Sequence, residues 1–131
     1  MDIEIRGYDH VGIRVSDRER ALAFYGKLGF KPDPAFTTEE VAEIVGADGT
    51  RIKLIFNGAP LPNAHNVLLD DPVKLTGYTH AAFVVERLGA LVEWAEREGV
   101  RITEGPVDWG RRITCFIRDP DGNVLEFNEL K

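Results

Sequence analysis

The sequence predicts an α+β fold built from two βαβββ repeats, with curled mixed sheets around a central cavity. The first observation is an internal repeat: residues 9–15 match residues 79–85, so position 10 corresponds to position 80 at an offset of 70. The second is a downstream match between residues 48–54 and residues 121–127, at an offset of 73. Self-similarity at a nearly constant offset indicates a repeated supersecondary unit.

The length of the chain sets the domain organisation. With 131 residues it is expected to form a single domain, residues 1–131, large enough for a real core. Within that domain we expect a first module over residues 1–57 and a second over residues 75–131. Residues 58–74 carry three prolines and are predicted to be the linker.

Local patterns predict the elements of the first module in order. Residues 8–15 alternate and are rich in β-branched side chains, which predicts a strand. Ser16 or Asp17 is expected to cap a helix that ends at Gly29, because apolar side chains recur at helical spacing between them. A proline-containing strand, expected at a sheet edge, and a hairpin complete the module. These three strands span residues 30–36, 41–45 and 51–57.

The second module repeats this order. Residues 76–85 predict a strand, and residues 88–98 predict a helix that ends at Gly99. A short strand and a hairpin follow, and the turn of the hairpin is Asp-Pro-Asp-Gly-Asn. These last strands span residues 101–103, 112–118 and 123–129.

Composition and charge exclude several functions. A net charge of −6 and a pI near 5.1 argue against nucleic acid as a partner, because phosphate binding needs a basic face. No apolar run approaches 18 residues, so no membrane span is expected, and the first residues have no signal-peptide core. We therefore expect a cytoplasmic protein. The single Cys115 lies in an apolar run and is expected to be buried and inert.

Strand alternation gathers the chemistry-bearing side chains on one face of each sheet. The repeat pairs His10 with His80 and Lys53 with Glu126, and a pseudo-twofold relation would bring all four to one centre. A lone histidine on a strand is usually a structural, hydrogen-bonded residue. Two histidines at equivalent positions, with a carboxylate at a third, favour a metal site.

Several of these segments resemble one family. Residues 9–17, 23–25 and 28–30 resemble the opening of vicinal-oxygen-chelate proteins, and residues 119–127 resemble their closing hairpin. That superfamily comprises glyoxalases, bleomycin-resistance proteins and extradiol dioxygenases. The resemblance covers nearly the whole chain and implies paired βαβββ units around a metal site.

The resemblance implies His10, His80 and Glu126 as metal ligands. At the fourth family position this chain carries Lys53, where glyoxalase I members bear a carboxylate and methylmalonyl-CoA epimerases a carboxamide. A protonated lysine has no lone pair for a cation. Two histidines and one carboxylate form the ligand set typical of non-haem iron(II) enzymes, so Fe(II) is the favoured metal, with Mn, Ni or Zn as alternatives.

The resemblance leaves three functions open. An extradiol-type dioxygenase, acting on a small substrate that chelates the metal through adjacent oxygens, is favoured on the three-ligand set. The alternatives are a metal-dependent lyase or isomerase of the glyoxalase kind, and a metal-free protein that sequesters a drug. Family members of this length usually form homodimers, which is the expectation here.

Further residues are candidates for contacts with substrate. Lys53 is expected to stay charged and bind substrate, or to shuttle a proton if its pKa falls. Tyr78 is a candidate proton donor, and Tyr8 a candidate substrate contact, although such tyrosines more often only pack. The remaining candidates for substrate binding are Arg51, Trp109 and Arg111.

Overall fold

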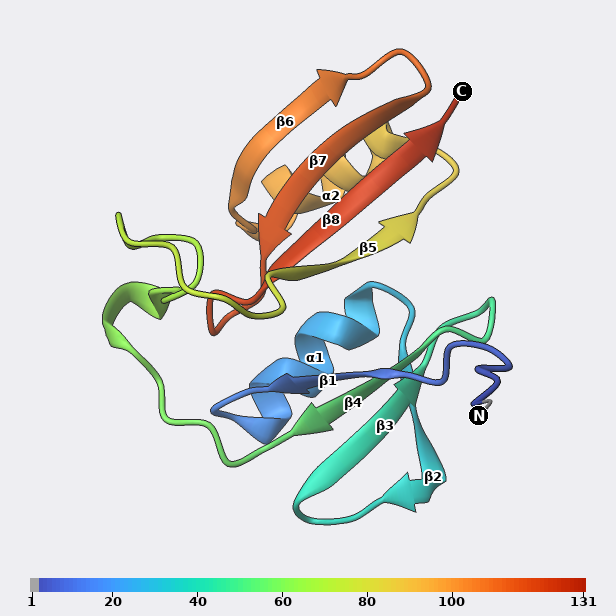
Figure 1. Cartoon of the computed structure of the whole chain (residues 1–131), viewed down its shortest axis with the longest axis vertical. Helices are drawn as coiled ribbons and strands as arrows, with labels where there is room; N and C mark the ends of the chain where they lie inside the picture. The colour runs from blue at the N-terminus through green and yellow to red at the C-terminus, as the bar shows by residue number, and fades with distance from the viewer. Residues whose placement is uncertain (1–2) are drawn as a thin grey trace. The chain divides into compact units, whose positions relative to one another are not determined.

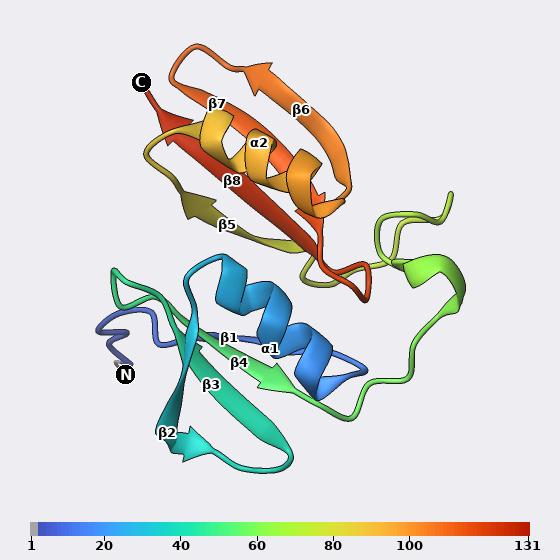
Figure 2. The ribbon, with the colours of Figure 1, turned by 180° about the vertical axis from the view of Figure 1, so that it is seen from behind.

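The computed structural model describes residues 3–131, and contacts divide them into two compact units. The first unit extends to Ala59 and the second runs from Pro60 to Lys131. Each unit is a four-stranded mixed sheet with one helix on one face (Figures 1 and 2). The predicted α+β class with a repeated βαβββ order is thus confirmed.

In the first unit the first and last strands are parallel neighbours. The sheet order is β1-β4-β3-β2, and β1 pairs with β4 in parallel while the other pairs are antiparallel. The proline-containing β2 lies at the sheet edge, as predicted. The elements are β1 (Val11–Arg14), α1 (Arg18–Lys27), β2 (Lys31–Thr37), β3 (Val41–Val45) and β4 (Arg51–Ile55).

The second unit has the same topology. Its sheet order is β5-β8-β7-β6, again with the first and last strands parallel. The elements are β5 (His80–Val84), α2 (Leu88–Glu98), β6 (Ile102–Asp108), β7 (Arg112–Arg118) and β8 (Val124–Leu130), with a short 3₁₀ turn, η1 (Pro62–Ala64), before them.

Three predicted strands differ most from the observed ones in their boundaries, and smaller shifts occur elsewhere, such as at the end of β4. The strand predicted over residues 8–15 begins only at Val11, where the parallel pairing with β4 starts, and it ends at Arg14. The strand predicted from residue 76 likewise begins at His80, which pairs with the first residue of β8. The short strand predicted over residues 101–103 extends to Asp108, because an irregular register with β7 continues its pairing.

Helix ends follow the predicted signals. Asp17 caps α1, since its Oδ1 accepts a hydrogen bond of 2.8 Å from the backbone N–H of Arg20. Gly99 ends α2 in the left-handed conformation, at φ 68°. At the other end of α2, the carboxylate of Glu129 on β8 accepts a 2.8 Å hydrogen bond from the backbone N–H of Leu88. This contact ties the start of the helix to the last strand.

Each unit buries its own apolar face beneath its helix. In the first unit Ile52 and Leu54 of β4 are fully buried with Tyr25 of α1. In the second unit Leu125 of β8 and Cys115 of β7 are equally buried. Burial raises the pKa of the Cys115 thiol to about 11, so it is protonated at neutral pH and inert, as predicted. No helix within residues 3–131 is long and apolar enough to cross a membrane.

The segment predicted as linker folds onto the turn between β7 and β8. Arg118 donates to both carboxylate oxygens of Asp70, at 3.0 and 2.7 Å. The side-chain amide of Asn66 donates to the backbone carbonyl of Gly122 at 3.0 Å. His65 pairs with Asp71 at 2.7 Å. The contacts of Asp70 with Arg118 and of Asn66 with Gly122 attach the segment from Pro60 onward to the second unit, while the His65–Asp71 contact lies within the segment.

This attachment should weaken in acid. The hydrogen bonds from Arg118 hold the pKa of the Asp70 carboxyl well below its ordinary value of 3.8. Its contribution to stability is therefore complete above the ordinary value and is lost as pH falls through the depressed value. Asp70→Asn should lower the unfolding midpoint at pH 7, and the difference from wild type should vanish in strong acid. Urea unfolding followed across pH checks this; a difference that stays constant with pH would contradict it.

Candidate metal centre

In the second unit a histidine and a carboxylate meet on one sheet face. His80 is the first residue of β5, and Glu126 lies on the parallel neighbour β8, in register with Ala82. Alternation places His80, Ala82 and Glu126 on the same face. Nε2 of His80 lies 3.1 Å from Oε1 of Glu126, and the Glu126 side chain is only 15% exposed.

Neighbouring groups hold this pair in place. The Asn128 amide donates to the other oxygen of Glu126 at 2.7 Å, and the buried Thr114 hydroxyl donates to Asn128 at 2.6 Å. The hydroxyl of Thr79 lies 2.8 Å from Nδ1 of His80, and the ring of Phe116 packs edge-on at 5.3 Å. Supporting hydrogen bonds of this kind fix ligand orientation in metal sites.

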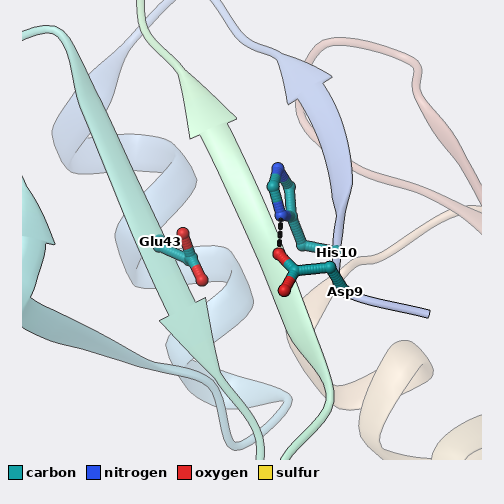
Figure 3. Close-up of side chains that lie close together, drawn as sticks. All are labelled: Asp9, His10 and Glu43. Atoms are coloured by element: carbon teal, nitrogen blue, oxygen red, sulfur yellow. Dashed lines mark hydrogen bonds and ion pairs between the residues drawn. The ribbon is translucent and has the colours of Figure 1, made fainter. Parts of the chain in front are cut away.

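In the first unit the equivalent histidine has different neighbours. His10 lies just before β1, and its Nδ1 is 2.5 Å from Oδ2 of Asp9. Glu43 extends from β3 toward both, and one ligand atom from each of the three residues lies within 4.8 Å of the others (Figure 3). Neither Asp9 nor Glu43 was among the residues predicted from the sequence.

A sequence signal for Glu43 existed. It is the only charged residue in the apolar segment Val-Ala-Glu-Ile-Val, and strand alternation sets it on the face opposite Ala42 and Ile44. It is also aligned, at the offset of 73, with Phe116, which packs on His80. A search for ligands on only the first and last strands of each module misses Glu43, which lies on β3.

The two basic candidates of β4 have different surroundings. Lys53 is half-buried and lies in register between Gly12 and Glu43. Arg51 donates hydrogen bonds to Glu43 at 2.9 Å and to Asp33 at 3.1 Å. The bond to Glu43, followed by the bond to Asp33, raises the pKa of the guanidinium. Arg51 is therefore held by two carboxylates, and its predicted contact with substrate stays a prediction.

The other predicted substrate contacts are exposed in their own units. Tyr78 is 97% exposed and precedes β5, while Tyr8 is 82% exposed and precedes β1. Trp109 and Arg111 lie in the turn between β6 and β7 and are also exposed. Their predicted roles in catalysis and binding stay predictions.

The donor set suits a divalent transition metal. Imidazole nitrogen together with carboxylate oxygen is the ligand type of Fe(II), Mn(II), Ni(II) and Zn(II) sites. Glu126 is largely withdrawn from water, and a buried carboxylate needs a cation or donors as partners. His80 and Glu126 thus fit a metal in the second unit, and His10 offers the same imidazole in the first.

Comparison with known proteins defines the class. The model of the Glyoxalase/Bleomycin resistance protein/Dioxygenase superfamily matches residues 7–127, and the chain belongs to this family. The resemblance stated from the sequence is confirmed. Two solved structures share the fold: a glyoxalase family protein from Bacillus cereus (TM-score 0.76, 23% identity, 98% of this chain and 96% of that one) and a glyoxalase/dioxygenase from Nostoc punctiforme (TM-score 0.76, 22% identity, 96% and 92%).

Several named relatives also align with this chain. The lactoylglutathione lyase of Haemophilus influenzae is 29% identical over 93% of this chain and 91% of its own length. That of Escherichia coli O157:H7 is 30% identical with the same coverage. A virulence protein of Salmonella typhimurium is 30% identical over 92% of this chain and 82% of its own.

Proposed function

We propose that this protein is a metal-dependent enzyme whose small substrate binds the metal through two adjacent oxygens. The proposed ligands are His10, His80 and Glu126. The observation that carries the proposal is the His80–Glu126 pair at 3.1 Å, held by Asn128 and Thr79. Such prior orientation lowers the cost of assembling a ligand set.

Within this class we propose lyase or isomerase chemistry first. Lactoylglutathione lyases are among the named relatives that align over nearly the full chain, and this supports the lyase assignment. Extradiol-type dioxygenation, which the three-ligand set alone favours, is the second candidate. A metal-free, drug-sequestering function has less support, because it gives the histidines and Glu126 no role.

The residues of the site suggest a division of roles. When bound, the metal would supply Lewis-acid polarisation of the adjacent substrate oxygens. The Glu126 carboxylate can accept a proton from the substrate carbon that lies next to the metal-bound substrate oxygens. The Lys53 ammonium is suited to an anionic substrate group, and the Tyr78 hydroxyl to donating a hydrogen bond. A homodimer stays a prediction.

An activity screen separates the reaction classes. Chelator-treated protein would be loaded anaerobically with Fe(II), Mn(II), Ni(II) or Zn(II). It would then be given either the hemithioacetal isomer of lactoylglutathione or a series of catechols. Metal-dependent thioester formation supports the lyase, and oxygen uptake with catechols supports the dioxygenase. Inactivity on both, with every metal, would contradict both assignments.

Lys53→Met should weaken substrate binding and leave metal content unchanged. A hydrogen bond to a charged group contributes about 1.5–3 kcal/mol, so KM should rise roughly 10- to 100-fold. Lys31→Met, which removes an exposed lysine from β2 at the edge of the same sheet, is the matched control. Steady-state kinetics together with metal analysis test this. Loss of metal in Lys53→Met, with KM unaltered, would refute the role in binding substrate.

A further inference from the structure

Glu43 is a buried carboxylate in a strand whose other residues are apolar. It is 8% exposed, and Arg51 donates a hydrogen bond of 2.9 Å to its Oε1. A buried charge requires compensation, and Arg51 shares its own charge with Asp33. The Glu43 carboxylate therefore remains available to a second cationic partner on the side of Asp9 and His10, toward which it extends (Figure 3).

Comparison of the units shows what Glu43 replaces. In the second unit Glu126, on the last strand β8, supplies the carboxylate that contacts His80. The equivalent position in the first unit is Lys53, whose ammonium has no lone pair to offer a metal. Glu43 stands opposite Lys53 on the adjacent strand, on the same sheet face. In the first unit the carboxylate near the histidine therefore comes from β3, the strand next to β4, instead of from β4 itself.

We propose that Glu43, on β3, is the metal-binding carboxylate of the first unit, acting with His10 and Asp9. The inference rests on the proposed function, because Glu43 joins the ligands of the same metal. Asp9 orients His10 through its contact with Nδ1, so two positions of an octahedral metal stay open to the adjacent oxygens of the substrate. The imidazole of His10 and the carboxylate of Glu43 offer ligand atoms within 4.8 Å of each other, and this pair of donors suits a divalent first-row metal. Lys53 is thereby left to bind substrate, which explains how a lysine is tolerated at that position.

Titration of the metal-free full chain with Mn²⁺ and with Ni²⁺, by calorimetry, tests the inference. Glu43→Gln keeps the side-chain shape and removes the charge; we expect affinity to fall at least about tenfold, the lower end of losses seen when a supporting group is removed. Asp9→Asn, on an exposed side chain, should also lower affinity without disturbing the core. Glu39→Gln, at an exposed position near the start of the same strand, should bind as wild type does.

The outcomes separate this inference from the proposed function. Thermal unfolding without metal shows whether each variant is folded. Wild-type affinity in both Glu43→Gln and Asp9→Asn, with affinity lost in Glu126→Gln, would overturn the inference and leave the proposed function standing. Affinity lost in Glu43→Gln but unchanged in Glu126→Gln would support the inference and contradict the proposed ligand set.

Discussion

Glu126→Gln should lower affinity for the divalent metal and turnover by at least about 100-fold, since loss of a supporting group alone costs roughly 10- to 100-fold. The amide is isosteric and can still accept a hydrogen bond from Asn128 and donate one to His80, so the strand should keep its pairing. What disappears is the negative charge that a cation requires. Metal titration and kinetics on the same preparation measure both effects.

A matched variant distinguishes this effect from a general change in charge. Glu96→Gln removes one carboxylate from the exposed side of α2, in the same unit. It should leave metal affinity and turnover at wild-type values. If Glu126→Gln retained full affinity and activity, Glu126 would not be a ligand, and its hydrogen bonds to His80 and Asn128 would be structural.

Gly122→Ala should cause the largest loss of stability. The backbone of Gly122 has φ +85°, and a Cβ built there would lie 1.9 Å from the carbonyl oxygen of Ala64. The left-handed conformation costs about 1–2 kcal/mol for other residues, and overpacking about 1–3 more, so we expect a loss of about 2–5 kcal/mol. Both tryptophans, Trp94 and Trp109, belong to the second unit, so their fluorescence in urea reports its unfolding.

Gly110→Ala is the control for backbone strain alone. Gly110 also lies in a turn between strands of the second unit, at φ +92°. Apart from Gly110 and its two chain neighbours, no described residue has an atom within 4 Å of its built Cβ. It should cost only about 1–2 kcal/mol. Equal losses in the two variants would show that residues 60–74 move away from the added methyl group without a further loss of stability.

The repeat explains why the fold was predictable and the site only partly so. Two alignments within the sequence are enough to predict both βαβββ units, because each unit needs the same burial pattern to pack its helix. The meeting of His80 and Glu126 on one face follows from alternation along two parallel strands. The lone charge of Glu43 in an apolar strand is visible in the sequence, but its position opposite Lys53 and close to His10 emerges only from strand register and the fold.

The predicted linker, residues 58–74, shows a second limit of prediction from the sequence. Its prolines indicate irregular structure, yet they carry no information about what the segment contacts. Its attachment depends on the Asp70–Arg118 ion pair, between residues 48 positions apart, and on a glycine turn that admits the Ala64 carbonyl. The reaction could not be predicted from the three proposed ligands either, because the same donors serve oxygen-dependent and oxygen-independent chemistry.

Metal content of the anaerobically purified chain tests most directly whether the protein depends on a metal. Inductively coupled plasma mass spectrometry would be applied to wild type, His10→Ala and His80→Ala. We expect about one divalent transition metal per wild-type chain, and its loss in both variants. No metal in wild type after reconstitution, with both variants as stable as wild type, would contradict a metal-dependent enzyme and leave a metal-free binding protein as the better explanation.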